Sequence, residues 1–433
     1  MNRGLGFGIM ENRKLISEIG TKSLEPTGDP FILTRKRPCG PFSFVDSTKA
    51  EFSYDNPPPI YVKMEHLNEK KSFNKETTFE DFKVDKKGLL KLENEDIKEK
   101  QRGVVLDVFK DAATKIMEGA NVIGMSLPVR IFEPRSQMER LLDNFQGFPK
   151  GCKKMLETDD PVERLKILVV SFVSVIHHSM SQYKPFNPIL GETYTGKFDD
   201  ETDIYLEHIS HHPPICAYHF VNKRWTYSGK WAFNAEIGIK SIKPYNDGWG
   251  LLELEDGDKY ELMQPLATLG GMIAGSRTLK ISGALVIINK VNKLKAVVRF
   301  GEKSGIVFSG QADLTKGKIY TYKEEKHQDA LKKKKWLDKM DKMKKMEDVD
   351  ELKCEIDGSW QKQLTFNKEV LWDIDENKDY YDQQRFSPSP LPSDIRFRED
   401  IIWLSYGNES YAQNWKVKLE QQQRSDRKCR NKK

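Results

Sequence analysis

A cluster of histidines is the part of this sequence whose residue types could do chemistry. The stretch EHISHHPPICAYH, residues 207–219, holds four of the chain's eight histidines. Imidazole can bind a metal ion, transfer a proton or donate hydrogen bonds to an anion. Successive residues of a strand face opposite sides, so His211 and His212 can reach one ligand only where the chain bends. The pair Pro213-Pro214 predicts that bend.

Metal binding and hydrolysis have little support elsewhere in the sequence. There is no HExxH motif and no pair of thiolates, and the prolines rule out a helix that would align two ligands. A GxSxG motif and a phosphate-binding GxxxxGK loop are also missing, so serine hydrolysis and nucleotide chemistry lack their usual residues. Two interpretations of the histidine pair remain. The two histidines donate hydrogen bonds to a phosphate group, or they are structural residues at the end of a strand. The pair taken alone favours the structural interpretation.

The composition indicates a cytosolic protein. Hydrophobic residues make up 38% of the 433 residues, enough for a core, and 31% are charged. The longest nearly apolar run, residues 167–176, is too short to cross a bilayer, and the first residues lack the apolar core of a signal peptide. The five cysteines are scattered and form no CxxC motif, so we expect reduced thiols.

Positive charge gathers at the C-terminus. The net charge is +6, and the last eighteen residues, KVKLEQQQRSDRKCRNKK, hold eight Lys or Arg against two acids. A basic end on a neutral body favours an anionic surface or ligand nearby, either phosphate-rich lipid or nucleic acid. The alternative is a frayed tail with no partner.

The N-terminal part predicts little ordered structure, and helices follow it. Residues 1–100 combine proline-containing stretches with a segment rich in Lys, Glu, Asp and Asn, so we expect a weakly ordered extension. In residues 104–118 apolar side chains recur every three or four positions, which predicts an amphipathic helix. Another helix begins at Asp160-Pro161, an acidic cap followed by proline, and continues to Ser179. It is apolar almost all round and should be buried.

In residues 194–314 apolar residues recur at every second position instead of every three or four. Segments such as DIYLEHIS and RTLKISGALVII alternate with turn signals about every ten residues, which predicts an antiparallel barrel or sandwich. A Lys-rich insertion at 323–350 and a polar helix at 408–428 follow. In the insertion Trp336, Met340 and Met343 share one helical face among lysines. The pattern predicts a helix that lies on an anionic membrane or is simply solvated.

The residues around the histidines resemble a known family. Just upstream lies YKPFNPILGETY, residues 183–194, and the histidine stretch reads EHISHHPP. Together they resemble the oxysterol-binding-protein-related family, whose hallmark is EQVSHHPP. The chain departs from it by His208 for glutamine and Ile209 for valine. Similar segments also include SLPVRIFEPRSQMERL, DPVERLK, GSW, LPSDIRFRED and the final helix, so the resemblance covers roughly residues 105–430.

This resemblance implies a fold and an activity. The fold is α+β and mainly β: an incomplete antiparallel β-barrel that encloses a lipid tunnel, with flanking helices and an N-terminal lid. The lid candidate is the helix at 104–118, and residues 101–430 would form the whole lipid-binding domain. The activity is transfer of single lipids, commonly exchange of phosphatidylinositol 4-phosphate for a sterol or phosphatidylserine. It involves no catalysis, cofactor or metal.

The resemblance also assigns a binding site. The candidate lipid- and phosphate-binding residues are Lys184, Asn187, His211, His212, Lys416, Glu420 and Arg424. The last three match the family pattern KxxLExxQR, and their i, i+4, i+8 spacing puts them on one helical face. In that arrangement Glu420 can neutralise and orient Lys416 and Arg424 when no ligand is present.

Two other functions stay open at this point. A lipid sensor would bind the same ligands and recruit partners without net transport. A histidine-based lipid phosphatase or metal hydrolase would release phosphate or need a metal. For the transfer protein the expected partners are the exchanged lipids and, transiently, anionic membrane surfaces, with no nucleic acid. We expect a cytoplasmic protein, peripheral at organelle membranes.

Overall fold

The structure is a computed structural model. It describes residues 33–34, 43–44, 79–100, 103, 126–199, 201–237, 241–271, 276–301, 311–333, 335–377 and 380–430. The helix predicted at 104–118, our lid candidate, lies outside the described residues. β1 (Leu33–Thr34) and β2 (Ser43–Phe44) pair with each other as a separate antiparallel ribbon.

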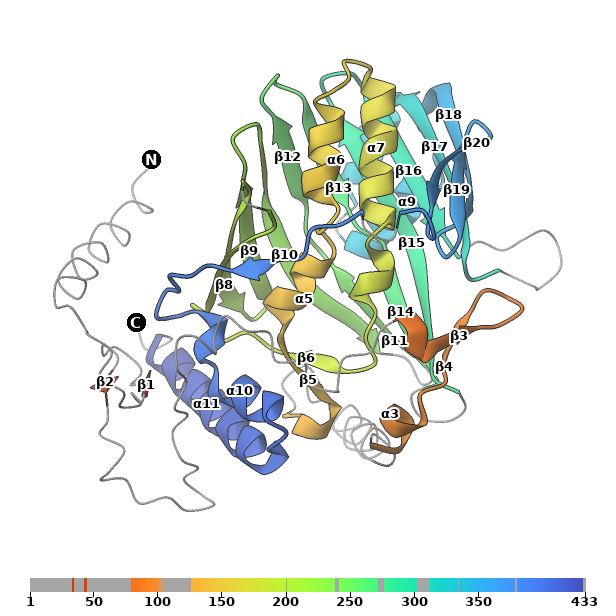
Figure 1. Cartoon of the computed structure of the whole chain (residues 1–433). Coiled ribbons are helices and arrows are strands. Elements are labelled where there is room, and N and C mark those ends of the chain that lie inside the picture. Colours follow the sequence, from red (N-terminus) through yellow and green to blue (C-terminus); the bar gives the residue numbers. More distant parts are fainter. Residues whose placement is uncertain are drawn as a thin grey trace.

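Antiparallel strands form a curved wall that is the main body of the molecule (Figure 1). In chain order the strands of this wall are β3 (Phe82–Val84), β4 (Leu90–Leu92), β7 (Thr193–Lys197), β8 (Asp203–His211), β9 (Pro214–Val221), β10 (Trp225–Ile237), β11 (Ser241–Asn246), β12 (Gly250–Leu254), β13 (Lys259–Met263), β14 (Leu266–Gly270), β15 (Thr278–Asn289), β16 (Leu294–Phe300), β17 (Leu314–Tyr322), β18 (Val349–Ser359), β19 (Gln363–Phe366), β20 (Glu369–Asp373) and β21 (Arg385–Phe386).

The wall is an incomplete barrel, as predicted. Pairing runs from β21 through β7, β8 and β9 to β10, then from β15 through β16, β17, β18 and β19 to β20. Between β10 and β15 the antiparallel pairing follows two separate routes. One passes through β11 and β14, and the other passes through β12 and β13. These two routes make a local closed circuit. Among the described strands no pairing joins β20 to β21 or β7, so the wall as a whole stays open.

Helices occupy the space that the wall surrounds. α5 (Gln137–Asp143), α6 (Phe148–Met155) and α7 (Pro161–Val173) share one hydrophobic core with the strands, and α6 and α7 run alongside each other (Figure 1). The Phe145 ring centroid, between α5 and α6, is 5.5 Å from that of Tyr218 and 5.2 Å from that of Tyr227. As predicted, Asp160 caps α7, accepting the backbone N–H of Val162 at 2.8 Å. The α-helix is shorter than predicted, because residues 176–179 form a 3-10 turn, η5.

Two predicted boundaries were wrong. Residues 79–100 belong to the folded body: η2 (Phe79–Asp81), β3, β4 and α3 (Glu95–Lys100) form there, and β4 pairs with β15. Leu90 and Leu92 are buried, so two apolar residues on one face of a short strand outweigh the charged composition around them. The barrel also continues past residue 314, because β17–β20 complete it on the far side of the Lys-rich insertion.

The interpretation of the Lys-rich insertion as a membrane-lying helix was also wrong. It folds as two short helices, α8 (Glu324–Leu331) and α9 (Trp336–Met343). The apolar face of α9 is packed on the outside of the barrel, with Trp336, Met340 and Met343 only 5%, 3% and 2% exposed. The predicted solvated helix is thus half right: the lysines face water, but the apolar side chains are already covered.

A smaller layer closes one end of the barrel (Figure 1). It contains η4 (Val129–Ile131), a parallel pair of β5 (Phe132–Ser136) and β6 (Lys184–Phe186), η6 (Ile395–Phe397), α10 (Glu399–Ser405) and α11 (Glu409–Arg430). The polar helix predicted at 408–428 is α11. A separate cluster of buried side chains holds this layer together. Among the described helices, none combines the length and the apolar character needed to span a bilayer.

Candidate lipid-headgroup site

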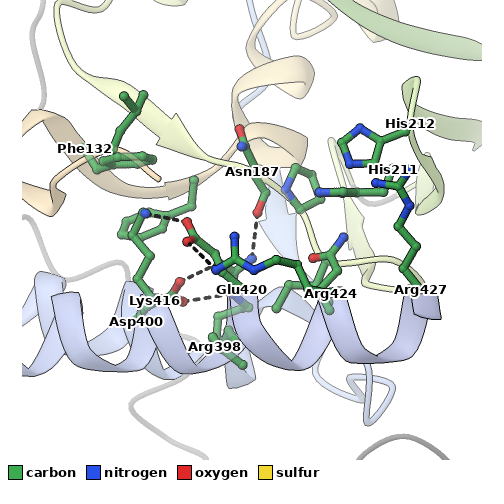
Figure 2. A pocket seen from close by; sticks show the side chains of 16 residues that line it. Phe132, Asn187, His211, His212, Arg398, Asp400, Lys416, Glu420, Arg424 and Arg427 are labelled. Atoms are coloured by element: carbon green, nitrogen blue, oxygen red, sulfur yellow. Dashed lines mark hydrogen bonds and ion pairs between the residues drawn. The ribbon is translucent and has the colours of Figure 1, made fainter. Parts of the chain in front are cut away.

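A cavity of about 520 Å³ lies where the β8–β9 hairpin, the loop after β6 and α11 meet. Its volume is in the range of small-molecule sites, about 300–1,000 Å³. The lining residues are Leu127, Phe132, Phe186, Asn187, Pro188, Ile189, His211, His212, Arg398, Asp400, Lys416, Leu419, Glu420, Gln423, Arg424 and Arg427. Figure 2 shows cationic side chains rising from α11 toward the two histidines and Asn187 on the opposite side.

The hairpin between β8 and β9 positions the histidine pair. His211 pairs with Pro214 across the hairpin, which leaves His212 and Pro213 as the turn. The predicted bend is therefore present, and it lets both rings reach the cavity, with ring centroids 4.9 Å apart. Burial, together with the neighbouring His212 and the positive charge of Arg427, lowers the pKa of His211 to about 4. At neutral pH both rings are thus hydrogen-bonding groups without charge.

Two lysines lie against one aromatic ring at the other end of the cavity. The Lys184 ammonium is 4.9 Å from the centroid of Phe132, its neighbour in the β5–β6 ladder, and the Lys416 ammonium is 5.3 Å from the same ring. Burial, together with the positive charge of nearby Lys416, lowers the pKa of Lys184 to about 7. Lys184 also donates to Oδ1 of Asn187 at 2.5 Å. Two like charges held this close favour an anion between them.

Glu420 separates the cations of α11, as its spacing predicted. Its carboxylate lies 2.5 Å from Nζ of Lys416 and 3.7 Å from Arg424. Lys416 is 5% exposed and also donates to Ser126, so its position is fixed before any ligand enters. Arg424 is more exposed and held by Glu420 alone in the contacts described, so it is the group most easily turned toward a ligand.

Arg427 was missed by the sequence interpretation. It lies eleven residues after Lys416, which is three helical turns and about 20° around the axis, so the two cations share a face about 16 Å apart. Arg427 lines the cavity beside the histidines and lowers the pKa of both. In the described part of the chain no carboxylate is paired with it. Helical spacing alone could have identified this residue.

A buried arginine network fixes the loop that carries Asn187. Arg398 donates to both oxygens of Asp400, to Glu192 at 2.8 Å and to the backbone carbonyl of Asn187 at 3.1 Å. Glu192 in turn accepts the backbone N–H of Ile189 at 2.7 Å. Burial works against the charge of Arg398, yet its two carboxylates raise its pKa above the ordinary value. Sequence interpretation gave these residues no role, since Asn187 and Glu192 lie about two hundred positions before Arg398.

The structure brings the seven predicted site residues to one place. Six of them line the cavity, and Lys184 joins it through Asn187 and Phe132. Their roles in holding a headgroup stay predictions. Within the described residues, no group of three or more His, Cys, Asp or Glu side chains is arranged to hold a metal ion.

Comparison with known proteins identifies the same region. Residues 112–433 match the family model described as oxysterol-binding protein. Oxysterol-binding protein 9 of Dictyostelium discoideum is 29% identical over 341 residues, 76% of either chain. Oxysterol-binding protein-related protein 3C of Arabidopsis thaliana is 29% identical over 77% of this chain and 73% of its own.

Solved structures share the fold. The Osh3 ORD from Saccharomyces cerevisiae, in complex with PI(4)P, superposes with a TM-score of 0.56 at 23% identity, over 74% of this chain and 84% of the other. The Osh1 ORD domain in complex with ergosterol also gives 0.56, at 20% identity over 71% and 76%. At these identities the likeness concerns the fold.

Proposed function

This chain belongs to the oxysterol-binding protein family, and from that premise we propose that it transfers lipids by exchange. It would extract phosphatidylinositol 4-phosphate from one membrane and carry a sterol or phosphatidylserine in return. The observation that supports this proposal best is the cavity itself. Lys416, Arg424, Arg427 and the histidine pair line it, and Lys184 adjoins it through Asn187. Among the described residues of the lining, the carboxylates are Glu420 and Asp400. Such a donor-rich site suits a phosphorylated headgroup.

The proposed mechanism is physical. A lipid that leaves a bilayer exposes its apolar surface at a cost of about 25 cal/mol per Å². An apolar interior that receives the chains, or a sterol, removes most of that cost and so lowers the barrier to desorption. The headgroup then stays at the mouth, where charged groups replace its water. In this proposal the protein works in the cytoplasm and contacts anionic organelle membranes transiently.

An exchange assay tests the proposal. Donor liposomes carry phosphatidylinositol 4-phosphate, acceptor liposomes carry a sterol or phosphatidylserine, and both transfers are followed with fluorescent lipid reporters. We expect phosphoinositide transfer, accelerated by one of the two counter-lipids. Binding without net transfer would favour a lipid sensor, and release of inorganic phosphate would favour a phosphatase. Either result contradicts the proposal.

Lys184 gives the proposed site a pH dependence of known sign. Its pKa is about 7, and a bound phosphate raises it, so binding takes up a proton above pH 7. At pH 7 the affinity for a soluble phosphoinositide headgroup should be about half of the value for fully protonated Lys184. It should then fall, by up to about tenfold per unit, as the pH rises toward the pKa of the bound state.

The control for this pH dependence is Lys184→Arg, because a guanidinium stays charged throughout the range. Isothermal titration between pH 7 and 9 should show a flatter profile for this variant than for the wild type. The phosphate monoester is already dianionic in that range, so it adds no slope of its own. Equal slopes for the two proteins would show that Lys184 does not face the phosphate.

A further inference from the structure

His208 lies behind the histidine pair, in the wall of the barrel. In a regular strand, residues three apart face opposite sides. The pairing of β8 with β9 shifts register between His208 and Ser210, which leaves Ile209 without a cross-strand partner and 50% exposed. This β-bulge turns His208 and His211 to the same side of the strand. Their ring centroids are 5.4 Å apart, and His208 is completely buried.

Three side chains form a hydrogen-bonded line from the core to the cavity. Sγ of Cys216, the cross-strand partner of His208, lies 3.3 Å from Nδ1 of His208. Nε2 of His208 lies 3.1 Å from Nδ1 of His211. Both nitrogens of His208 are thus engaged, and the remaining nitrogen of His211, Nε2, is the one available to the cavity that this ring lines.

The hydrogen bonds of this line can be oriented in two directions, which differ in which atom of each pair carries the proton. Burial, together with His211 and the positive charge of Arg398, lowers the pKa of His208 to about 3. The ring is therefore neutral and has one donor and one acceptor nitrogen. Burial raises the pKa of the Cys216 thiol, which keeps its proton. If the thiol donates to His208, then His208 donates to Nδ1 of His211, and Nε2 of His211 presents an N–H to the cavity.

In the reverse direction, Nε2 of His211 would present a lone pair. The charged groups near these rings are of both signs. Arg398 is near His208, and Arg427 and Glu420 are near His211. Phosphate oxygens accept hydrogen bonds, so only the first direction serves an anionic ligand. It also lets a neutral histidine act as a donor.

We propose that His208 is a positioning residue which, together with Cys216, fixes His211 as the Nε2–H tautomer and so aims a donor at a phosphate group in the cavity. The nature of the ligand rests on the proposed function, but the tautomer does not, because Cys216 and His208 set it within the protein. Where the family hallmark has glutamine, this chain has His208. A glutamine amide could also donate to Nδ1 of His211, so His208→Gln is the natural conservative variant.

The experiment reads the tautomer and the binding separately. Selective ¹⁵N-histidine labelling of the full chain and long-range ¹H–¹⁵N correlation spectra give the protonated nitrogen of each ring, and a His211→Ala spectrum identifies the His211 signals. We expect Nε2–H in the wild type and in His208→Gln. His208→Phe, with a ring of similar size and no hydrogen-bonding atom, should lose that fixed tautomer. Its affinity for glycerophosphoinositol 4-phosphate should fall about fivefold to tenfold, which is less than the loss of a whole hydrogen bond to phosphate, because the His211 ring is kept and only its fixed tautomer is lost.

The cysteine offers an independent pair of variants if His208→Phe does not fold. Cys216→Ala removes the donor behind His208, and Cys216→Ser restores one. The proposal predicts a mixed His211 tautomer and weaker binding for the first, and wild-type behaviour for the second. A proton on Nδ1 of His211 in the wild type, or equal spectra and affinities for these two variants, overturns it. A fixed Nε2–H tautomer in a wild type that does not bind the probe would instead contradict the proposed function.

Discussion

Replacing both His211 and His212 by alanine is expected to abolish extraction of phosphatidylinositol 4-phosphate from liposomes while the protein stays folded. Each hydrogen bond to a charged phosphate contributes about 1.5–3 kcal/mol, so losing two weakens binding by at least about a hundredfold. Neither ring belongs to the hydrophobic core, since His212 is exposed and His211 is partly exposed. The loss should therefore appear mainly in extraction, measured by co-sedimentation of lipid and protein. The thermal midpoint should fall by only a few degrees, because buried His208 loses its hydrogen-bond partner His211.

The matched control is His219→Ala. His219 lies on β9 and faces outward, where it contacts Ser228 across the strand at 2.7 Å. This variant also removes a histidine of the same hairpin, but away from the cavity. Full extraction by His219→Ala and none by the double variant would support the assignment. Normal extraction by a folded double variant would mean that the cavity holds its headgroup without the histidines.

The barrel was predictable because its signals are local. Alternation of apolar residues and short turns marks strands such as β8, in which buried and exposed residues alternate from Ile204 to Ile209. The pairing of Glu420 with Lys416 was predictable for the same reason, since helical spacing alone brings them together. Residues 79–100 were misjudged because a strand of three residues carries too few positions for a periodic pattern.

The parts of the site that sequence interpretation missed depend on contacts distant in the chain. Arg398 donates to Glu192 and to the backbone of Asn187, which lie about two hundred positions earlier in the chain and are brought together by the fold. The bulge at Ile209 is equally hidden, because a single unpaired residue in β8 leaves the alternating pattern of the strand before it unchanged. As a result, His208 was noticed only as a departure from the hallmark, and its contact with His211 could not be inferred.

Charge reversal at Arg424 should slow transfer of the phosphoinositide far more than transfer of the other lipid of the proposed exchange. Arg424→Glu removes a guanidinium that can pair with phosphate and places a second carboxylate beside Glu420 (Figure 2). We expect phosphoinositide transfer to fall at least about a hundredfold, because a charge-assisted pair is lost and a repulsion is gained. Transfer of the counter-lipid, which does not need this cation, should fall far less when it is measured alone between two liposome populations.

The reason for choosing Arg424 over Lys416 is its surroundings. Lys416 is buried between Ser126, Glu420 and the Phe132 ring, so reversing its charge would leave two carboxylates in a covered place and threaten the fold. The milder Lys416→Gln should therefore show the same selectivity with a smaller loss. Lys428→Glu is the control, because it makes the same change of charge on an exposed position of α11 outside the cavity lining. Two outcomes would contradict the headgroup assignment: an equal loss of transfer in Lys428→Glu and Arg424→Glu, or an equal loss for both lipids in Arg424→Glu. In either case the helix would serve general attraction to the membrane.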